Sequence, residues 1–309
     1  MFKNLFFLIF IWILIPSKAI SQEIQEVVVL EKKLTSLSGW SNNQSISSID
    51  EKELKDLDAQ HPKQIFRRSP GIWISRGSGQ EHLTAIRSPV LTGPGACGSF
   101  LVLEDGIPVR PTGFCNVNGL FETFFEMASN IETIRGPASA RYGANAMHGV
   151  INILSKPINS ENMIYANLGP NNYKNFKIRA GNKQDWSFGG SFVNNDGFRD
   201  QSGYDQQKVK MQSNFSIASW NASMRATFTN LNQETAGYVN GLNSYKNESF
   251  SNQNFNPDAY RDAKSQRISL ILTKEIDDSI NSITPYIRNN DMKFFQHFLP
   301  GTPLEENNH

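Results

Sequence analysis

Few residues of this chain have the type and spacing that chemistry requires. It contains two cysteines, Cys97 and Cys115, and five histidines. Neither cysteine has a second cysteine or a histidine at the spacing of zinc ligands, and the histidines form no cluster with metal-ligand spacing. No arrangement of nucleophile, base and metal indicates an enzyme. The sequence therefore predicts a protein that is not an enzyme and that holds neither a metal nor a cofactor.

One glycine-rich segment formally matches a dinucleotide-binding fingerprint. Residues 93–98 read Gly-Pro-Gly-Ala-Cys-Gly, which fits the pattern G-x-G-x-x-G. That fingerprint requires a preceding strand and a following helix, but the next residues, Phe100-Leu101-Val102-Leu103, are typical of a strand. We therefore interpret residues 93–98 as a glycine-rich loop.

The first 21 residues have the three parts of a secretory signal. Lys3 precedes an apolar run from Leu5 to Ile15, and Ala19 and Ser21 supply small residues before a cleavage site. The run is shorter than the 18 or so residues that a spanning helix needs. An uncleaved anchor helix is the alternative. We predict a signal peptide at residues 1–21 and an exported mature chain.

Export decides how the two cysteines are interpreted. In an oxidising compartment, a single pair of thiols favours a disulfide, so we expect Cys97 and Cys115 to be bridged. Two unpaired, small hydrophobic side chains are the alternative.

Composition and charge exclude several classes of protein. Of 309 residues, 39% are hydrophobic and 19% charged, which indicates neither a disordered chain nor a helical membrane protein. Thirty basic residues against 29 acidic ones leave a net charge of +1, so no global field attracts nucleic acid. Any partner must be recognised locally.

Residues 22–48 are polar and rich in serine, apart from one compact stretch. Gln25-Glu26-Val27-Val28-Val29-Leu30 favours an extended backbone, but its flanks offer no apolar face to bury. It is either a strand that waits for a partner sheet or a loose first strand of the next domain.

Residues 49–156 have the pattern of a compact α+β domain. Asp50 and Glu53 form a capping box that predicts a short helix. Short apolar runs follow, separated by glycine and proline, as in several short strands.

From residue 157 to 309 the sequence alternates between apolar or small residues and polar ones, with period two. A soluble sandwich also fits this alternation. The connections favour an outer-membrane barrel, because tight turns at 183–185, 219 and 277–279 alternate with long polar loops at 194–205 and 232–263. We expect about seven strands, with the chain stopping in a loop at His309. That is too few to close a large barrel, so we interpret the sequence as truncated.

Four motifs carry a family resemblance. Residues 131–153 read IETIRGPASARYGANAMHGVINI, which predicts a strand, a Gly-Pro break, one helical turn capped by Gly143, and a second strand. Upstream lie Ser69-Pro70-Gly71-Ile72-Trp73-Ile74, then Thr84-Ala85-Ile86-Arg87, then FLVLEDGIPV at residues 100–109. In order and spacing these segments resemble the plug signature of TonB-dependent receptors. The resemblance runs from about Glu26 to the end of the chain.

The resemblance implies a fold class and a domain order. We expect an α+β plug domain, followed by the first antiparallel strands of a transmembrane β-barrel that has 22 strands in full-length members and is incomplete here. The implied order is a signal peptide at 1–21, a TonB box and linker at 22–48, the plug domain at 49–156, and the N-terminal part of the barrel at 157–309. The TonB box is Glu26, Val27, Val28, Val29 and Leu30.

The resemblance also implies a function. It predicts a monomeric receptor in the outer membrane that takes up a scarce solute, foremost a ferric siderophore or another metal chelate, when a TonB-type energy transducer pulls on the TonB box. No nucleic acid is involved. The alternatives are a passive porin or adhesin, and a truncated receptor fragment without function.

Four residues are the candidate ligand contacts. Arg76, His82, Arg110 and Phe114 lie on segments that we place near the external face of the plug, where the loop pinned by Cys97 and Cys115 is also expected. A charged side chain on a loop is more often simply solvated, which is the alternative for each of them.

Overall fold

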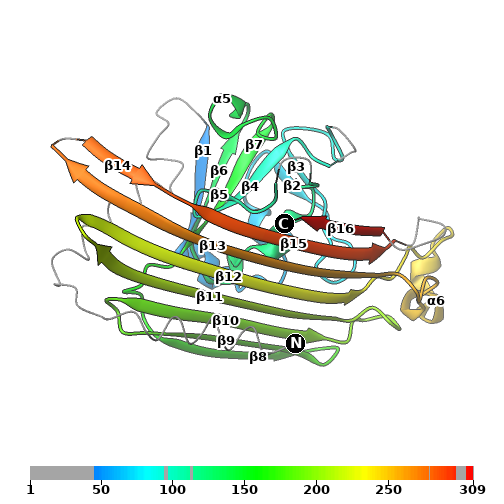
Figure 1. Ribbon diagram of the computed structural model, residues 1–309. Helices are drawn as coiled ribbons and strands as arrows, with labels where there is room; N and C mark the ends of the chain where they lie inside the picture. The colour runs from blue at the N-terminus through cyan, green and yellow to red at the C-terminus, as the bar shows by residue number, and fades with distance from the viewer. Residues whose placement is uncertain (1–44, 94–96, 112–113, 278, 297–303, 309) are drawn as a thin grey trace.

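The computed structural model describes residues 45–93, 97–111, 114–277, 279–296 and 304–308. The predicted signal peptide and the predicted TonB box at Glu26–Leu30 lie outside the described residues. Within them the chain forms a small α+β unit over residues 46–155, followed by a long curved sheet (Figure 1). No helix in these ranges is long and apolar enough to cross a membrane.

A five-stranded sheet forms the centre of the α+β unit. Its order is β1-β6-β7-β4-β5, and β4 pairs with β7 in parallel while the other neighbours are antiparallel. The strands are β1 (Ile46–Asp50), β4 (Phe100–Glu104), β5 (Ile107–Pro108), β6 (Ala128–Arg135) and β7 (Gly149–Ser155). β4 is buried along its whole length and β7 along all but its last residue. Continuous burial is typical of a strand that is covered on both faces.

Short helices begin where the sequence supplies caps. In α3 (Glu51–Leu57) the Glu53 backbone N–H donates to Asp50 Oδ1 at 2.9 Å, so the Asp50 half of the predicted capping box is confirmed. In α4 (Pro62–Phe66) the Lys63 backbone N–H donates to His61 Nδ1 at 3.1 Å. A two-stranded sheet of β2 (Ile72–Ile74) and β3 (Thr84–Ile86) packs with these helices in one core.

The predicted strand, break, helical turn and strand over residues 131–153 are confirmed. β6 ends at Arg135, α5 (Ser139–Tyr142) is closed by Gly143, and β7 begins at Gly149. A Cβ at Gly149 would lie 2.3 Å from the Ile134 carbonyl oxygen, so only glycine lets β7 approach β6 this closely. Asp105 and Gly106 form the hairpin that joins β4 to β5, with φ of 53° and 79°.

The second sheet is antiparallel throughout and has nine strands. Its order is β16-β15-β13-β12-β11-β10-β9-β8, with β14 also on β13. The strands are β8 (Met163–Gly169), β9 (Tyr173–Gly181), β10 (Trp186–Asn195), β11 (Tyr204–Ile217), β12 (Trp220–Glu234), β13 (Tyr260–Ile276), β14 (Ser279–Ile283), β15 (Tyr286–Phe295) and β16 (Leu304–Asn308). β14 and β15 follow one another along β13, so they act as a single interrupted strand. In the described residues the sheet does not close.

One part of the strand prediction is wrong. We expected the last residues to lie in a loop, but Leu304–Asn308 forms β16 and pairs with β15 from Phe294 to Asn290. Its sequence, Leu-Glu-Glu-Asn-Asn, has no apolar alternation. Strand ends that extend beyond a membrane need none, so the pattern could not reveal it.

The predicted asymmetry of the connections is confirmed, with the expected exception of the first connection, residues 170–172, which joins β8 to β9 by a short turn at the loop end. At one end, Asn182 Oδ1 accepts the backbone N–H groups of Gln184, Asp185 and Trp186 at 2.8–3.0 Å, and Ala218-Ser219 alone joins β11 to β12. At the other end, residues 235–259 form a long connection that contains η5 (Ser244–Lys246) and α6 (Glu248–Asn252). We call these the turn end and the loop end; in Figure 1 they lie at the left and right.

The two faces of the long sheet differ. Alternate residues such as Lys208, Lys210 and Gln212 of β11 are buried against the α+β unit, which lies in the hollow of the sheet (Figure 1). The opposite, outward face exposes apolar side chains, among them Ile164, Leu168, Phe176, Phe192 and Ile287.

Candidate functional site at the plug–wall interface

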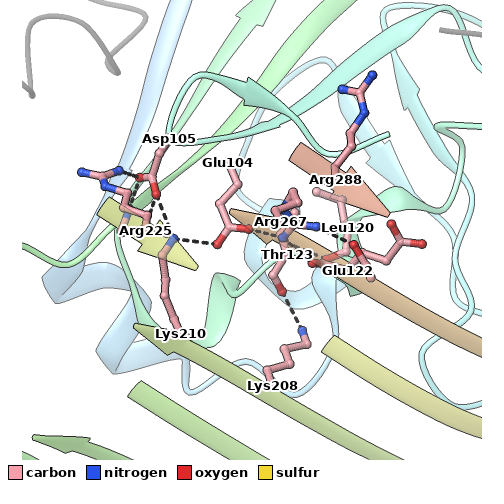
Figure 2. A network of polar contacts seen from close by, with 12 residues as sticks. Glu104, Asp105, Leu120, Glu122, Thr123, Lys208, Lys210, Arg225, Arg267 and Arg288 are labelled. Atoms are coloured by element: carbon pink, nitrogen blue, oxygen red, sulfur yellow. Dashed lines mark hydrogen bonds and ion pairs between the residues drawn. The ribbon is translucent and has the colours of Figure 1, made fainter. Parts of the chain in front are cut away.

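Buried charges join the α+β unit to the long sheet. Glu104 and Asp105, at the end of β4, meet three basic side chains that project inward from the sheet (Figure 2). Lys210 Nζ of β11 lies 2.9 Å from Glu104 Oε1 and 2.8 Å from Asp105 Oδ2. Arg225 Nη1 of β12 lies 2.6 Å from Asp105 Oδ1, and Arg267 of β13 pairs with Glu104.

The local field keeps Glu104 charged although it is buried. Burial by itself raises the pKa of this carboxyl, but the Lys210 and Arg267 charges outweigh burial and lower its pKa to about 2. Asp105 is held within its own unit as well, since it accepts the Ser155 backbone N–H at 2.8 Å. Such a cluster fixes the register between the two parts of the chain, whereas its net contribution to stability is small.

A second polar group surrounds Glu122, the last residue of η3 (Gly119–Glu122). Arg110 donates to Glu122 Oε1 from Nη2 at 2.7 Å and from Nε at 3.1 Å. Asn290 Nδ2 of β15 donates to Glu122 Oε2 at 2.8 Å, and Arg267 Nη2 donates to the Glu122 carbonyl at 2.9 Å. Glu122 thus links an arginine of its own unit to two strands of the sheet.

Lys208 of β11 continues this row of inward cations. Its Nζ lies 2.7 Å from Glu126 Oε1. It also donates to the Thr123 carbonyl at 2.8 Å (Figure 2). The Lys208 side chain is 1% exposed, so both contacts are shielded from solvent.

Two further polar contacts join the two parts of the chain. At the loop end, Glu81 Oε1 lies 3.2 Å from Arg261 Nε and accepts Gln296 Nε2 at 2.9 Å. At the β8–β9 edge of the long sheet, Asp58 Oδ1 lies 3.0 Å from Lys177 Nζ of β9 while Tyr165 of β8 donates to Oδ2. Burial raises the pKa of Asp58, but the Tyr165 and Lys177 contacts outweigh it and leave the pKa lowered.

Among the described residues, one cluster of buried apolar side chains joins the two parts of the chain, and it lies near the loop end. It joins Phe114 and Phe121 of the α+β unit to Tyr204, Leu231, Ala263 and Met292 of the sheet. Two other apolar clusters lie wholly within the α+β unit. The interface is therefore mainly polar and ion-paired. A partly open pocket of about 440 Å³, lined by Asp50, Asp105 and Arg225 among others, lies at this interface.

Three of the four sequence-predicted ligand contacts come together. His82 stacks edge-on against Phe121 with ring centroids 6.1 Å apart, and the Arg110 guanidinium lies over the Phe114 and Phe121 rings at 5.0 and 5.5 Å. All three are buried, at 2%, 1% and 8% exposure for His82, Arg110 and Phe114. Arg76 is exposed, and its charge acts on His61, whose ring centroid lies 5.9 Å from that of His82. Cys97 and Cys115 form a disulfide that lies close by.

Burial also sets the charge state of the two histidines at this place. His82 loses solvent and faces His61, which together lower its pKa to about 3. Burial lowers the pKa of His61 to about 4, although its ring bonds the Glu81 carbonyl. Both rings are therefore neutral at ordinary pH. No group of three or more metal-binding side chains occurs within the described ranges.

The sequence did not indicate the residues that hold the interface together. Glu104, Glu122, Lys208, Lys210 and Arg267 look like solvated charges when each is taken alone. One feature of the sequence could have pointed to them. The lysines and arginines occupy alternate positions of their strands, and these positions form the inward face, which requires polar partners. Their individual partners follow from tertiary packing.

A small α+β unit that is held by ion pairs in the hollow of a curved antiparallel sheet is the architecture of proteins in which a plug fills a β-barrel. Residues 40–150 match the family model described as TonB-dependent Receptor Plug Domain. These residues belong to that plug family, and the strands after them have the fold of the barrel wall in the same receptors. From here on, the α+β unit is called the plug and the long sheet the wall.

Solved structures give the same result. The chain is similar to the ferric yersiniabactin uptake receptor FyuA from Yersinia pestis, at 18% identity and a TM-score of 0.64 over 84% of this chain and 42% of that one. It is also similar to the ferric citrate transporter FecA, at 17% identity and 0.64 over 81% and 40%. For the siderophore receptor PiuA from Acinetobacter baumannii the values are 15% and 0.61 over 85% and 38%. The chain spans about two fifths of the length of these structures, and at such identities the likeness concerns the fold.

Proposed function

We propose that this chain is part of an outer-membrane receptor that imports a metal chelate, foremost a ferric siderophore, with energy from a TonB-type transducer. The observation that carries the proposal is the nature of the plug–wall interface. A plug that must rearrange to admit a solute needs contacts that specify its position without a large apolar area to separate. The ion pairs of Glu104 and Asp105 with the wall, together with the hydrogen bond from Asn290 to Glu122, meet that requirement.

The outward face of the wall supports placement in a bilayer. The register row Leu168, Lys174, Asn194, Asp205, Asn232, Asp262 and Lys293 crosses the strands near the loop end. On each strand we counted the residues from this row towards the turn end until the first apolar residue of the outward face. This number increases by two from one pair of strands to the next. These residues are Leu168 itself, then Phe176 and Phe192 two positions on, Val209 and Phe228 four positions on, and Ile268 and Ile287 six positions on.

This regular shift means that the apolar border runs obliquely across the strands. The border shifts by two residues for every two strands. At about 3.4 Å per residue and about 4.8 Å between strands, this shift corresponds to strands inclined by roughly 35° to the normal of a flat border. Strands of outer-membrane barrels incline by roughly 35–45°. The stepped border is therefore what a flat membrane surface produces on a tilted wall.

The position of β1 supports coupling at the N-terminal side. β1 is an edge strand of the plug, paired on one side only, with β6 from Ile46↔Ile134 to Asp50↔Asn130. The proposed TonB box, Glu26–Leu30, precedes it and would add as a strand to the sheet of the transducer through backbone hydrogen bonds. A pull on that segment acts first on the five residues of β1 and on α3 behind it.

We propose that the ligand is bound at the loop end of the plug. Of the four candidate contacts, Arg76 is the exposed one, and it is suited to an anionic chelate. His82, Arg110 and Phe114 are buried around Phe121, so a ligand reaches them only when the loops above them move.

Uptake of a radiolabelled ferric chelate by cells that produce the receptor as their sole importer tests this function. Deleting residues 26–30 should abolish uptake and leave binding of the chelate to the cell surface unchanged, whereas deleting residues 33–37 should preserve both. Uptake that survives deletion of residues 26–30 would indicate a passive porin, and loss of surface binding would indicate a misassembled protein.

A further inference from the structure

The inward face of the wall carries charges of one sign. On strands β9 to β15, every charged side chain that is buried or half-buried at an inward position is a lysine or an arginine. These cations are Lys177, Arg179, Lys208, Lys210, Arg225, Arg261, Arg267 and Arg288. Glu275 has the same parity on β13, but it is exposed at the turn end.

The outward face of the same strands differs, because it carries both signs. Asp205 and Asp262 lie there together with Lys174 and Lys264. The whole chain has a net charge of only +1. The excess of cations on the inward face is therefore a property of that face and does not reflect a basic composition.

The plug covers most of these cations with its own carboxylates. Six of the eight pair with five carboxylates, and all five belong to the plug (Figure 2). The five are Asp58, Glu81, Glu104, Asp105 and Glu126. Arg288 donates to the Pro108 carbonyl of the plug at 3.0 Å, and Arg179 donates to carbonyls of the segment that joins plug and wall. A plug that separates from the wall takes these five carboxylates with it.

The cations form a continuous track along the wall. One row of register neighbours crosses four strands and consists of Lys210, Thr227, Arg267 and Arg288. On β13, Arg261 lies six residues from this row towards the loop end, and on β12, Arg225 lies two residues from it towards the turn end. At about 3.4 Å per residue, the track extends over roughly 27 Å along the strands.

Uncovering the track changes the field inside the barrel. A cleft lined by charges of one sign focuses the field and raises the local concentration of ions of opposite sign by roughly 10-fold to 1,000-fold. Anionic groups can then take the place of the plug carboxylates on the lysines and arginines, whereas a cation is repelled. When the plug returns, its carboxylates compete with the solute for the same side chains, which favours release of the solute.

We propose that these eight lysines and arginines form a cationic track that guides the solute past the plug and selects solutes of net negative charge. The inference rests on the proposed function and deepens it, because it names the imported chelate as an anion. The track is covered at rest, so it acts after the solute has bound at the loop end.

Cysteine labelling measures the potential of the track without knowledge of the solute. Thr227→Cys places a thiol between Lys210 and Arg267 without a change of charge, and Thr227 is only 4% exposed at rest. The native Cys97 and Cys115 are bridged and do not react. The full receptor, in cells with an energised transducer, is treated in turn with anionic sulfonatoethyl methanethiosulfonate and with cationic trimethylammonioethyl methanethiosulfonate.

The ratio of the anionic to the cationic labelling rate is the readout. At Thr227→Cys this ratio should be about tenfold or more above the ratio at Leu242→Cys, a position in the long loop-end connection that is 96% exposed. Ser269→Cys, at the register partner of Arg225, repeats the measurement where the first variant does not fold.

A matched pair of charge variants assigns the ratio to the track. Arg288→Gln keeps a donor for the Pro108 carbonyl and removes one charge, so in the Thr227→Cys receptor it should lower the ratio about twofold or more. Lys264→Gln removes a charge from the outward face of the neighbouring strand β13 and should leave the ratio unchanged.

Two outcomes would overturn the inference. One is a ratio at Thr227→Cys and Ser269→Cys equal to that at Leu242→Cys, and the other is a lack of labelling at both positions in a receptor that imports the chelate. Failure of the proposed function has a different signature, because labelling and uptake would then both survive deletion of residues 26–30.

Discussion

Lys210 on β11 of the wall binds two consecutive carboxylates of the plug, with Nζ 2.9 Å from Glu104 and 2.8 Å from Asp105. From the two next strands, Arg225 pairs with Asp105 and Arg267 pairs with Glu104, so three cations surround two carboxylates. Three strands of the wall, β11, β12 and β13, therefore form ion pairs with the single β4–β5 hairpin of the plug. This contact lies deep in the interface, where water does not screen it.

Removing Glu104 should release the plug from the wall. Glu104→Ala leaves Lys210 and Arg267 buried without this partner, and breaking a buried pair from one side costs about 3–5 kcal/mol. We expect earlier thermal release of the plug, measured by limited proteolysis on heating. Glu51→Ala is the matched control, because Glu51 pairs with Lys156 while 43% exposed, and such pairs contribute about 0–1 kcal/mol. Equal effects of the two variants would contradict a specific role for the buried cluster.

Acid should destabilise the plug through its buried histidines. The folded-state pKa values of His61 and His82 are about 4 and about 3, below the ordinary 6.5, so protons bind preferentially to the unfolded chain. The two neutral histidines therefore make their full contribution to the free energy of unfolding above pH 6.5, and this contribution is lost as the pH falls towards 4. At two pH units below 6.5, each histidine should contribute a loss of up to about 2.7 kcal/mol.

A pH series of melting temperatures measures this effect. Glu104, whose pKa is lowered to about 2, keeps its stabilising charge until the pH falls below about 4.5, so it does not confound the upper part of the series. The His82→Gln variant should melt with a shallower dependence between pH 6.5 and 4.5. A slope identical to that of the wild type would show that His82 is not buried as a neutral ring.

The disulfide should stabilise the plug by constraining the unfolded chain. Cys97 and Cys115 are 18 residues apart, and a loop of this length corresponds to about 3 kcal/mol. The double variant Cys97→Ser/Cys115→Ser avoids a stray thiol and should lower the melting temperature of the plug. The bond itself is checked by treating wild-type protein with a thiol alkylating agent without reductant. If the disulfide exists, no cysteine reacts and the gel migration of the protein is unchanged. Alkylation of both cysteines without reductant would refute the bond.

Close approach of β7 to β6 should make one glycine irreplaceable. In Gly149→Ala the new Cβ would lie 2.3 Å from the Ile134 carbonyl oxygen, and such overpacking costs about 1–3 kcal/mol. Gly119→Ala serves as the control, because its Cβ would meet Val102 at an ordinary 3.7 Å. Denaturant midpoints should fall for the first variant and stay nearly constant for the second.

The fold could be predicted from the sequence where local rules decide it. The Asp50 cap, the Asp105-Gly106 hairpin, the glycine-marked segment at 131–153 and the alternation of the wall strands each follow from backbone chemistry. β16 could not be predicted, because its pairing with β15 leaves no periodic trace in a polar segment.

The candidate site was less accessible to sequence reasoning. A loop arginine such as Arg110 looks solvated in the sequence, yet its side chain is buried against Glu122, Phe114 and Phe121. Asp58 meets Lys177 across 119 positions of sequence. Such pairs arise from how the plug docks on the wall, and no local pattern records that docking.

In the proposed mechanism, the pull on the TonB box must separate β1, the first strand of the plug, from its neighbour β6 before the solute can enter. Ser47 and Thr133 are register partners on β1 and β6, with hydroxyl oxygens 2.7 Å apart, so cysteines at both positions can form a disulfide that pins β1. With the wild type under the same reductant as control, uptake of the labelled chelate should stop in oxidised Ser47→Cys/Thr133→Cys receptor and resume after reduction. Undiminished uptake through the oxidised receptor, with the bond verified, would contradict the account.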